Sequence, residues 1–191
     1  VQAGADAVSG LEVDKVGVIS TVFTHNSQIY PRRILARSPR KLVVLSCGCP
    51  DLARLVEHSL GDPEGMDRVE GELRRELAPL VQEGVDCCVL GCTHYPLLRS
   101  VVRDIMGLGV ELVNPAYETA LGLGRLLEEC GLSNDSAGPR MERGQSNGSA
   151  NPQDAPMYQF YVSDAAEKFK NFANSILPCE IKEAQLIQIE E

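Results

Sequence analysis

The chain has 191 residues, 43% of them hydrophobic, and a formal net charge of −9 at pH 7. This length suffices for one full domain, or for one domain and part of another, and no apolar run approaches the roughly 18 residues that span a membrane, so we expect a soluble protein without membrane contact. The acidic balance argues against a nucleic-acid partner, because binding to phosphate groups needs a basic surface.

The sequence begins at Val1 without an initiator Met or a signal-peptide pattern, as expected of a chain entered in the middle. Four short β-rich segments follow along the chain. They are continuous apolar runs rather than alternating ones, which is typical of strands buried on both faces of a parallel sheet. The predicted strands cover residues 16–19, 42–45, 87–90 and 110–113.

Helical patterns lie between these segments. Apolar residues at steps of three and four predict an amphipathic helix over 66–80, which Pro79 should bend or end early. Ser27 is predicted to cap the helix that follows it, and Pro96 fits the first turn of a helix over 97–106. Strands that alternate with helices imply right-handed crossovers and an α/β fold, a parallel sheet flanked by helices.

The composition changes over 133–156 to small and polar residues, with almost no large apolar side chain. Such a stretch buries too little surface to offset its ordering entropy, so it is predicted to be a flexible linker. A strand over 158–162, a helix with Phe169 and Phe172 on one face, and a β-like stretch over 184–189 complete the chain.

Seven cysteines make an odd number in a chain of ordinary size, which is not a disulfide framework. Most lie in apolar stretches, where a thiol behaves as a small hydrophobe, so we expect reduced thiols in a reducing compartment. No Cys-x-x-Cys pair is present, and no metal is predicted. A zinc site remains an alternative, and its ligands would be Cys47, Cys49, Cys92 and His94.

The most informative segment covers residues 89–98, where a buried strand ends at Gly91 and polar groups gather before a helix. Sheets of the α/β class bind ligands beyond the carboxyl ends of their strands, where a helix N-terminus favours anions and ionised thiols. Cys92 and His94 are two residues apart, so in an extended segment they point to the same side. The pattern favours a reactive thiol at an anion-binding site over a merely structural cysteine.

The run from Gly91 through Cys92 and His94 to Leu98 closely resembles the second cysteine signature of glutamate racemases, in the aspartate/glutamate racemase superfamily. Aspartate racemases of that superfamily typically carry Glu where this chain has His94, which favours glutamate. Phe23 departs from the family pattern, because many members have a small residue there. Other segments are similar to the family in weaker ways, namely 16–24 with Ser27 and Tyr30, 49–57, and 160–169.

The resemblance implies two α/β domains related by pseudo-twofold symmetry, with the site between them. This chain would hold one complete domain and a C-terminal segment of the other, and it would lack the half that carries the first catalytic cysteine in an Asn-Thr context. The implied parts are the second domain over 1–115, a crossing helix over 116–132, the linker over 133–156, and a strand and helix of the missing first domain over 157–191.

In such an enzyme two groups on opposite faces of the substrate exchange its α-proton. The resemblance makes Cys92 one of them, with His94 assisting its proton transfers and Glu57 orienting His94. Thr93 and His94 would bind the substrate. Two further threonines would line the pocket, Thr21 and Thr24. The structural alternatives are a solvated Glu57 and threonines that only cap helices.

The resemblance therefore implies a cytoplasmic, cofactor-independent glutamate racemase that supplies D-glutamate for peptidoglycan. A homodimer is the oligomeric state considered for the full-length protein. The 191-residue chain alone is expected to be inactive. Three alternatives remain: a racemase of another acidic amino acid or a hydantoin, a non-catalytic remnant that acts only as a binding domain, and a Cys-His hydrolase. The hydrolase is the weakest, because the sequence pattern shows neither a third orienting group nor a Gly-rich nucleophile turn.

Overall fold

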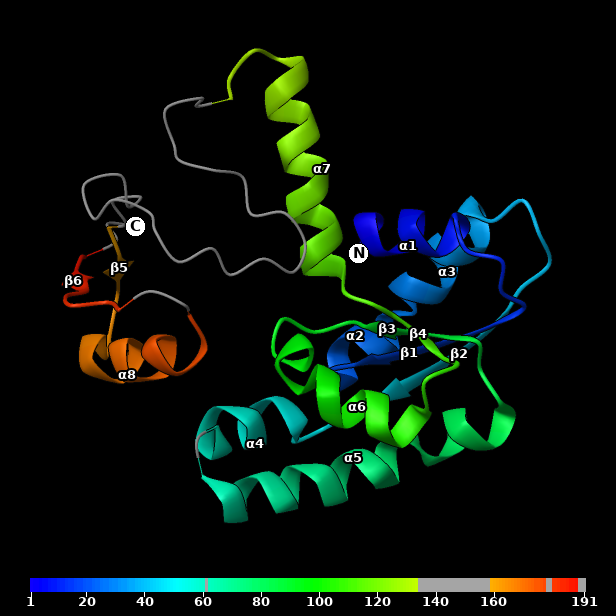
Figure 1. Ribbon diagram of the computed structural model, residues 1–191, viewed down its shortest axis with the longest axis horizontal. Helices are drawn as coiled ribbons and strands as arrows, with labels where there is room; N and C mark the ends of the chain where they lie inside the picture. The colour runs from blue at the N-terminus through cyan, green and yellow to red at the C-terminus, as the bar shows by residue number, and fades with distance from the viewer. Residues whose placement is uncertain (61, 134–158, 178–179, 189–191) are drawn as a thin grey trace. The chain divides into compact units, whose positions relative to one another are not determined.

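The computed structural model describes residues 1–60, 62–133, 159–177 and 180–188. The chain divides into two compact units, Val1–Leu123 and Gly124–Glu191 (Figure 1). The first unit holds the sheet and every residue proposed above for the site. No helix among the described residues has the length and apolarity to cross a bilayer.

The described part of the first unit contains a parallel sheet in the order β2-β1-β3-β4. At the centre of the register, Ile19 pairs with Cys47 on one side and with Leu90 on the other. Each predicted strand is confirmed, with ends that differ by up to three residues. The observed strands are β1 (Lys15–Ser20), β2 (Val43–Gly48), β3 (Cys87–Leu90) and β4 (Glu111–Val113).

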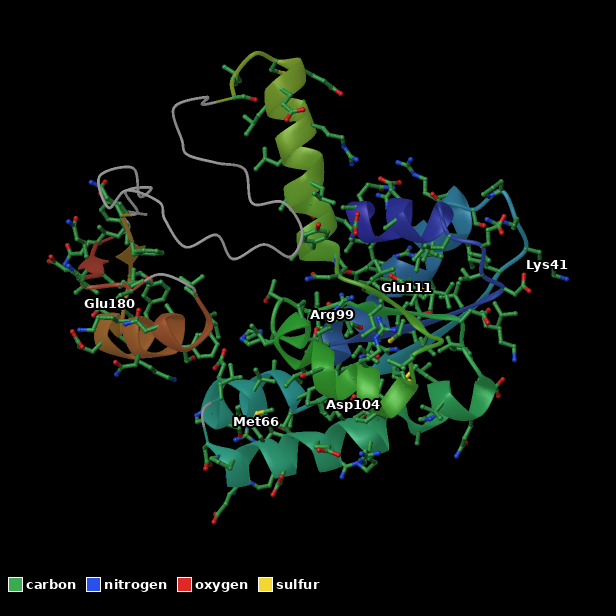
Figure 2. The ribbon with its side chains drawn as sticks, in the orientation of Figure 1. Lys41, Met66, Arg99, Asp104, Glu111 and Glu180 are labelled. Carbon is green, nitrogen blue, oxygen red and sulfur yellow. The ribbon has the colours of Figure 1, made fainter. Side chains whose placement is uncertain are left out.

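Helices cover both faces of this sheet, as the continuous apolar strands predict (Figure 1). Val16 and Val18 belong to the core under α1 (Gln2–Ser9) and α3 (Ile29–Arg37), and Ile19 belongs to the core on the opposite face. The helices that supply this second core are α4 (Leu52–Ser59), α5 (Pro63–Glu83) and α6 (Arg99–Met106). Figure 2 shows Met66 of α5 beside α4, where it packs against the second core.

The long helix α5 follows its predicted apolar stripe, since Val69, Leu73, Leu77 and Leu80 are all buried. Its first turn is capped by Asp62 and its last by Gly84 at φ 62°. The expectation that Pro79 could end this helix early is wrong. The residue is exposed and the helix continues to Glu83, because a proline removes only one hydrogen bond and its ring lies on the solvent side.

The entry to α3 also differs from its prediction. A separate short helix, α2 (Val22–Ser27), precedes it, and the N-cap of α3 is Gln28 at φ 53° rather than Ser27. The Ser27 hydroxyl nevertheless accepts a hydrogen bond from the Ile29 N–H at 3.3 Å. Ser27 therefore lies one residue before the N-cap, and its hydroxyl still satisfies the first N–H of α3.

The predicted crossing helix is α7 (Pro115–Glu129), whose first turn is held by the Asn114 side chain. In the second unit β5 (Tyr161–Val162) and β6 (Gln185–Leu186) pair in parallel, and α8 (Ala166–Ile176) connects them. Apart from Ser133, the predicted linker over 133–156 lies outside the described residues, as does Tyr158. The assignment of these parts to two racemase domains stays a prediction.

Candidate active site

The candidate site lies at the carboxyl edge of the sheet, where three strands end side by side. Backbone hydrogen bonds continue across this edge beyond the strands. The N–H of Cys49 donates to the carbonyl oxygen of Ser20 at 2.8 Å, and the N–H of Gly91 donates to that of Ile19 at 2.7 Å. The loops that follow β2 and β3 are therefore both tied to the end of β1.

Gly91 sets the direction in which the chain leaves β3. A Cβ at this position would lie 2.8 Å from the carbonyl oxygen of Ile19 and 2.9 Å from Cε2 of Tyr30. No larger side chain fits so close to a neighbouring backbone. The close approach of β1 and Tyr30 explains the glycine and fixes the position of Cys92, the next residue.

Three of the predicted site residues meet in one series of contacts. The Sγ atom of Cys92 lies 3.7 Å from Nδ1 of His94, and Nε2 of His94 lies 2.8 Å from Oε1 of Glu57. A ring protonated on Nε2 donates to the carboxylate, and its Nδ1 is then the atom that can accept from the thiol. Thr93 is beside the same ring, with Oγ1 at 3.4 Å from Nδ1.

The local backbone differs from the extended segment predicted for Cys92 and His94. His94 has φ −80° and ψ −30°, and the Tyr95 N–H donates to the Cys92 carbonyl, so the segment is a turn. The turn brings the thiol and imidazole together even though the segment is not extended. The 3₁₀ helix η1 (Tyr95–Leu98) follows, and the α-helix begins only at Arg99.

Thr21 and Thr24 form a separate pair at the start of α2. The Thr21 hydroxyl is the N-cap of this helix, accepting from the Thr24 N–H at 3.4 Å and donating to Thr24 Oγ1 at 3.1 Å. The capping alternative therefore describes Thr21 correctly, and a role in the pocket stays a prediction. Phe23, between them, has 85% of its surface exposed.

Cys49 and Tyr95 form a buried pair that was not among the residues predicted for catalysis or substrate binding, although Cys49 was a ligand of the alternative zinc site. Burial, with the charge of Glu76, raises the pKa of Cys49 to about 12. Tyr95 is fully buried, and its hydroxyl, which lies beside the Cys49 thiol, makes no hydrogen bond of standard geometry with the described residues. Only the apolar spacing around Tyr95 could have indicated this packing from the sequence.

The core thiols behave as the small hydrophobes that the sequence predicts. Burial, with smaller contributions from nearby carboxylates, raises the pKa of Cys87 to about 12, and burial also raises the pKa of Cys88. Cys92 is only half-buried. In the part of the chain that the structure describes, no group of three or more His, Cys, Asp or Glu side chains could hold a metal ion, which leaves the alternative zinc site without support.

Comparison with known sequences identifies relatives of this chain. A family model described as Asp/Glu/Hydantoin racemase matches residues 1–120. Glutamate racemase of Symbiobacterium thermophilum is 39% identical over 150 residues, which cover 78% of this chain and 52% of the relative. Glutamate racemase of Lactiplantibacillus plantarum is 32% identical over 164 residues, which cover 86% and 53%. The chain thus spans about half the length of the curated relatives it matches.

Solved structures give the same picture. A glutamate racemase isoform of Bacillus anthracis superimposes with a TM-score of 0.77 at 29% identity, covering 100% of this chain and 63% of that one. The Francisella tularensis glutamate racemase, solved in complex with D-glutamate, gives 0.75 at 27% identity, with 97% and 61% covered. Because the family model also matches more than half of its residues, this chain belongs to the Asp/Glu/Hydantoin racemase family.

Proposed function

We propose that this chain takes part in the cofactor-independent racemisation of glutamate, with Cys92 as the thiol that exchanges the α-proton on one face of the substrate. The observation that carries the proposal is the series of contacts from Cys92 Sγ through His94 to the Glu57 carboxylate. A thiol, an imidazole and a carboxylate in this order can take up and return a proton.

In the proposed reaction the Cys92 thiolate removes the α-proton, and the electron pair of the broken C–H bond passes into the substrate carboxylate. A second acid then protonates the opposite face, and the two groups exchange roles for the other enantiomer. The resemblance expects a cysteine in an Asn-Thr context for this second role, and these 191 residues contain no such motif.

His94 would relay the proton of Cys92, and Glu57 would hold the imidazole in the tautomer that leaves Nδ1 towards the thiol. Thr93 would bind the substrate carboxylate through its backbone and hydroxyl groups, because donors near that group stabilise the charge that develops there. Thr21 and Thr24 would line the pocket from α2. The functional setting proposed is the cytoplasmic supply of D-glutamate for peptidoglycan, by a full-length protein that would form a homodimer.

The test uses the full-length protein, expressed from its natural reading frame. It incubates L-glutamate with this protein in D₂O and measures the optical rotation and the loss of the NMR signal of the Cα–H. We expect decay to the racemate with one deuterium incorporated at Cα and no added cofactor. Cys92→Ser should lower kcat by a factor of about 10² to 10⁴, the usual contribution of a positioned acid or base. Cys130→Ser removes an exposed thiol and serves as the control.

Racemisation that persists in Cys92→Ser, or that requires added pyridoxal phosphate, would contradict the proposal. Aspartate and a hydantoin are assayed alongside glutamate, because the family description names all three classes. A higher kcat/KM for either of them would keep the proposed chemistry and change the substrate.

A further inference from the structure

Helix α2 lies at the carboxyl edge of the sheet without an apolar face to hold it there. None of its six residues is buried, and the side chains of Val22 and Phe23 are exposed. A short helix in a protein owes most of its stability to an apolar face packed against a core. The position of α2 therefore depends on a small number of polar and close contacts.

His25, in the last turn of α2, makes such contacts with the neighbouring strand β2. Its Nδ1 lies 2.9 Å from the Ser46 hydroxyl. The ring also lies against Gly48, because a Cβ there would be only 3.1 Å from Cβ and Cγ of His25. A side chain in place of Gly48 would push the imidazole away from the strand. Imidazole and hydroxyl can each donate or accept, so this hydrogen bond can form with either tautomer of the ring.

The two ends of α2 are thus attached to different strands. Its N-cap, Thr21, directly follows Ser20 at the end of β1, whereas His25 contacts Ser46 of β2. Thr24 lies between these two attachments and immediately precedes His25 in the chain. The hydroxyls of Thr21 and Thr24 are therefore placed by the connection to β1 at one end and by the His25 contact at the other.

We propose that His25 is a positioning residue, which holds α2 on the end of β2 and thereby places Thr21 and Thr24 at the edge of the site. The inference rests on the proposed function, in which these threonines line the pocket. Groups that bind the substrate equally in the ground state and the transition state change KM rather than kcat. Loss of the His25 contact should therefore appear in KM.

Hydrogen exchange in the 191-residue chain, followed by NMR, tests the attachment without any need for activity. Ser46→Ala removes one hydroxyl from β2 and leaves every residue of α2 in place. The N–H groups of His25 and Gln28 both donate hydrogen bonds within α2 and its caps. We expect these two amides to exchange about three- to tenfold faster, which corresponds to the loss of one hydrogen bond, while the amides of β1 keep their rates.

Ser9→Ala is the matched control, because the Ser9 hydroxyl donates within its own helix, to the carbonyl oxygen of Asp6 at 2.6 Å. This variant should leave exchange in α2 unchanged. His25→Leu should accelerate it as Ser46→Ala does, and the double variant should add little more, because both changes remove the same hydrogen bond. Unchanged exchange in Ser46→Ala, or an equal acceleration in α2 and β1, would overturn the proposal. Ser46→Ala keeps the test decisive if His25→Leu does not fold.

Kinetics of the full-length protein test the consequence for the site. His25→Leu and Ser46→Ala should each raise KM for L-glutamate about three- to tenfold, with kcat changed by less than about twofold. His25→Asn should restore most of the lost affinity, because its side-chain amide can reach Ser46 from about the place of Nδ1. An unchanged KM, or a loss confined to kcat, would overturn the proposal. Absence of racemisation would contradict the proposed function of Cys92, whereas the exchange rates would still decide whether His25 holds α2.

Discussion

His94 and Glu57 are 37 residues apart in the sequence, yet Nε2 of the imidazole lies 2.8 Å from Oε1 of the carboxylate. The imidazole belongs to the turn after β3 and the carboxylate to α4. The contact therefore depends on the packing of α4 against the second core, which links stability on this face of the sheet to the geometry of the candidate site.

In the active full-length protein proposed above, Glu57→Gln should lower kcat by a factor of about 10 to 100, with little change in KM, a loss typical of groups that orient a functional side chain. The amide keeps a hydrogen-bonding group near Nε2 but removes the charge that stabilises a protonated imidazole. Steady-state kinetics with L- and D-glutamate measure the effect. Glu12→Gln, an exposed site, is the control, and an equal loss there would rule out a specific role for Glu57.

In the active full-length protein proposed above, His94→Ala should lower kcat more in one direction of racemisation than in the other. The imidazole contacts Cys92, and Cys92 would serve a single face of the substrate, so the step in which this thiol removes a proton should lose most. Initial rates from each enantiomer, with deuterium incorporation at Cα, test this. Equal losses in both directions would indicate a role in general binding or structure instead.

Stability should fall as the pH rises from about 8 to about 10. The folded chain keeps Cys49 and Cys87 protonated because their pKa is about 12, whereas the thiols of an unfolded chain ionise near 9. The unfolded state thus binds fewer protons in this window, and each thiol contributes a loss of up to about 1.4 kcal/mol per pH unit. Urea unfolding at several pH values measures the slope. Cys87→Ala should reduce it, whereas Cys130→Ala, which changes an exposed thiol, should leave it unchanged.

Gly91→Ala should lower the free energy of unfolding by about 1 to 3 kcal/mol, because the added methyl meets the backbone of Ile19 and the Tyr30 ring. Gly71→Ala is the matched control within α5, where a Cβ would meet nothing within 4 Å. That change should stabilise the protein by about 0.5 to 1 kcal/mol, since alanine loses less entropy in a helix. Thermal unfolding of both variants gives the comparison. An unchanged free energy of unfolding in Gly91→Ala would mean that the backbone of β1 moves away from the added methyl group at little cost.

The sequence predicts the sheet well because a buried parallel strand has a local signature. Cys87–Leu90 is recovered with its observed ends, since all its residues are apolar and buried. β2 is predicted too short, because its end includes Ser46, and the Ser46 hydroxyl has a distant partner in His25 Nδ1 at 2.9 Å. A polar strand end satisfied by a distant residue leaves no pattern in its own segment.

The site is only partly visible from local patterns. Cys92 and His94 are close in sequence, so their proximity can be predicted, although the backbone that creates it is a turn. Glu57 entered the prediction only through family resemblance, because its contact depends on how α4 packs. The approach of Tyr30 to Gly91 has no signature in either segment, since it depends on α3 and β3 meeting in space.

The buried thiols of β3 and of the loop after β2 owe their low reactivity to the fold rather than to their chemistry. Once the sheet opens, Cys49, Cys87 and Cys88 regain ordinary thiol reactivity. In air, oxidation of the opened chain would form sulfenic acids or disulfides that cannot be packed again in the core. Unfolding of this protein should therefore be reversible with a reductant present and irreversible without it. The half-life of the folded protein without reductant would then be set by the rate at which the sheet unfolds.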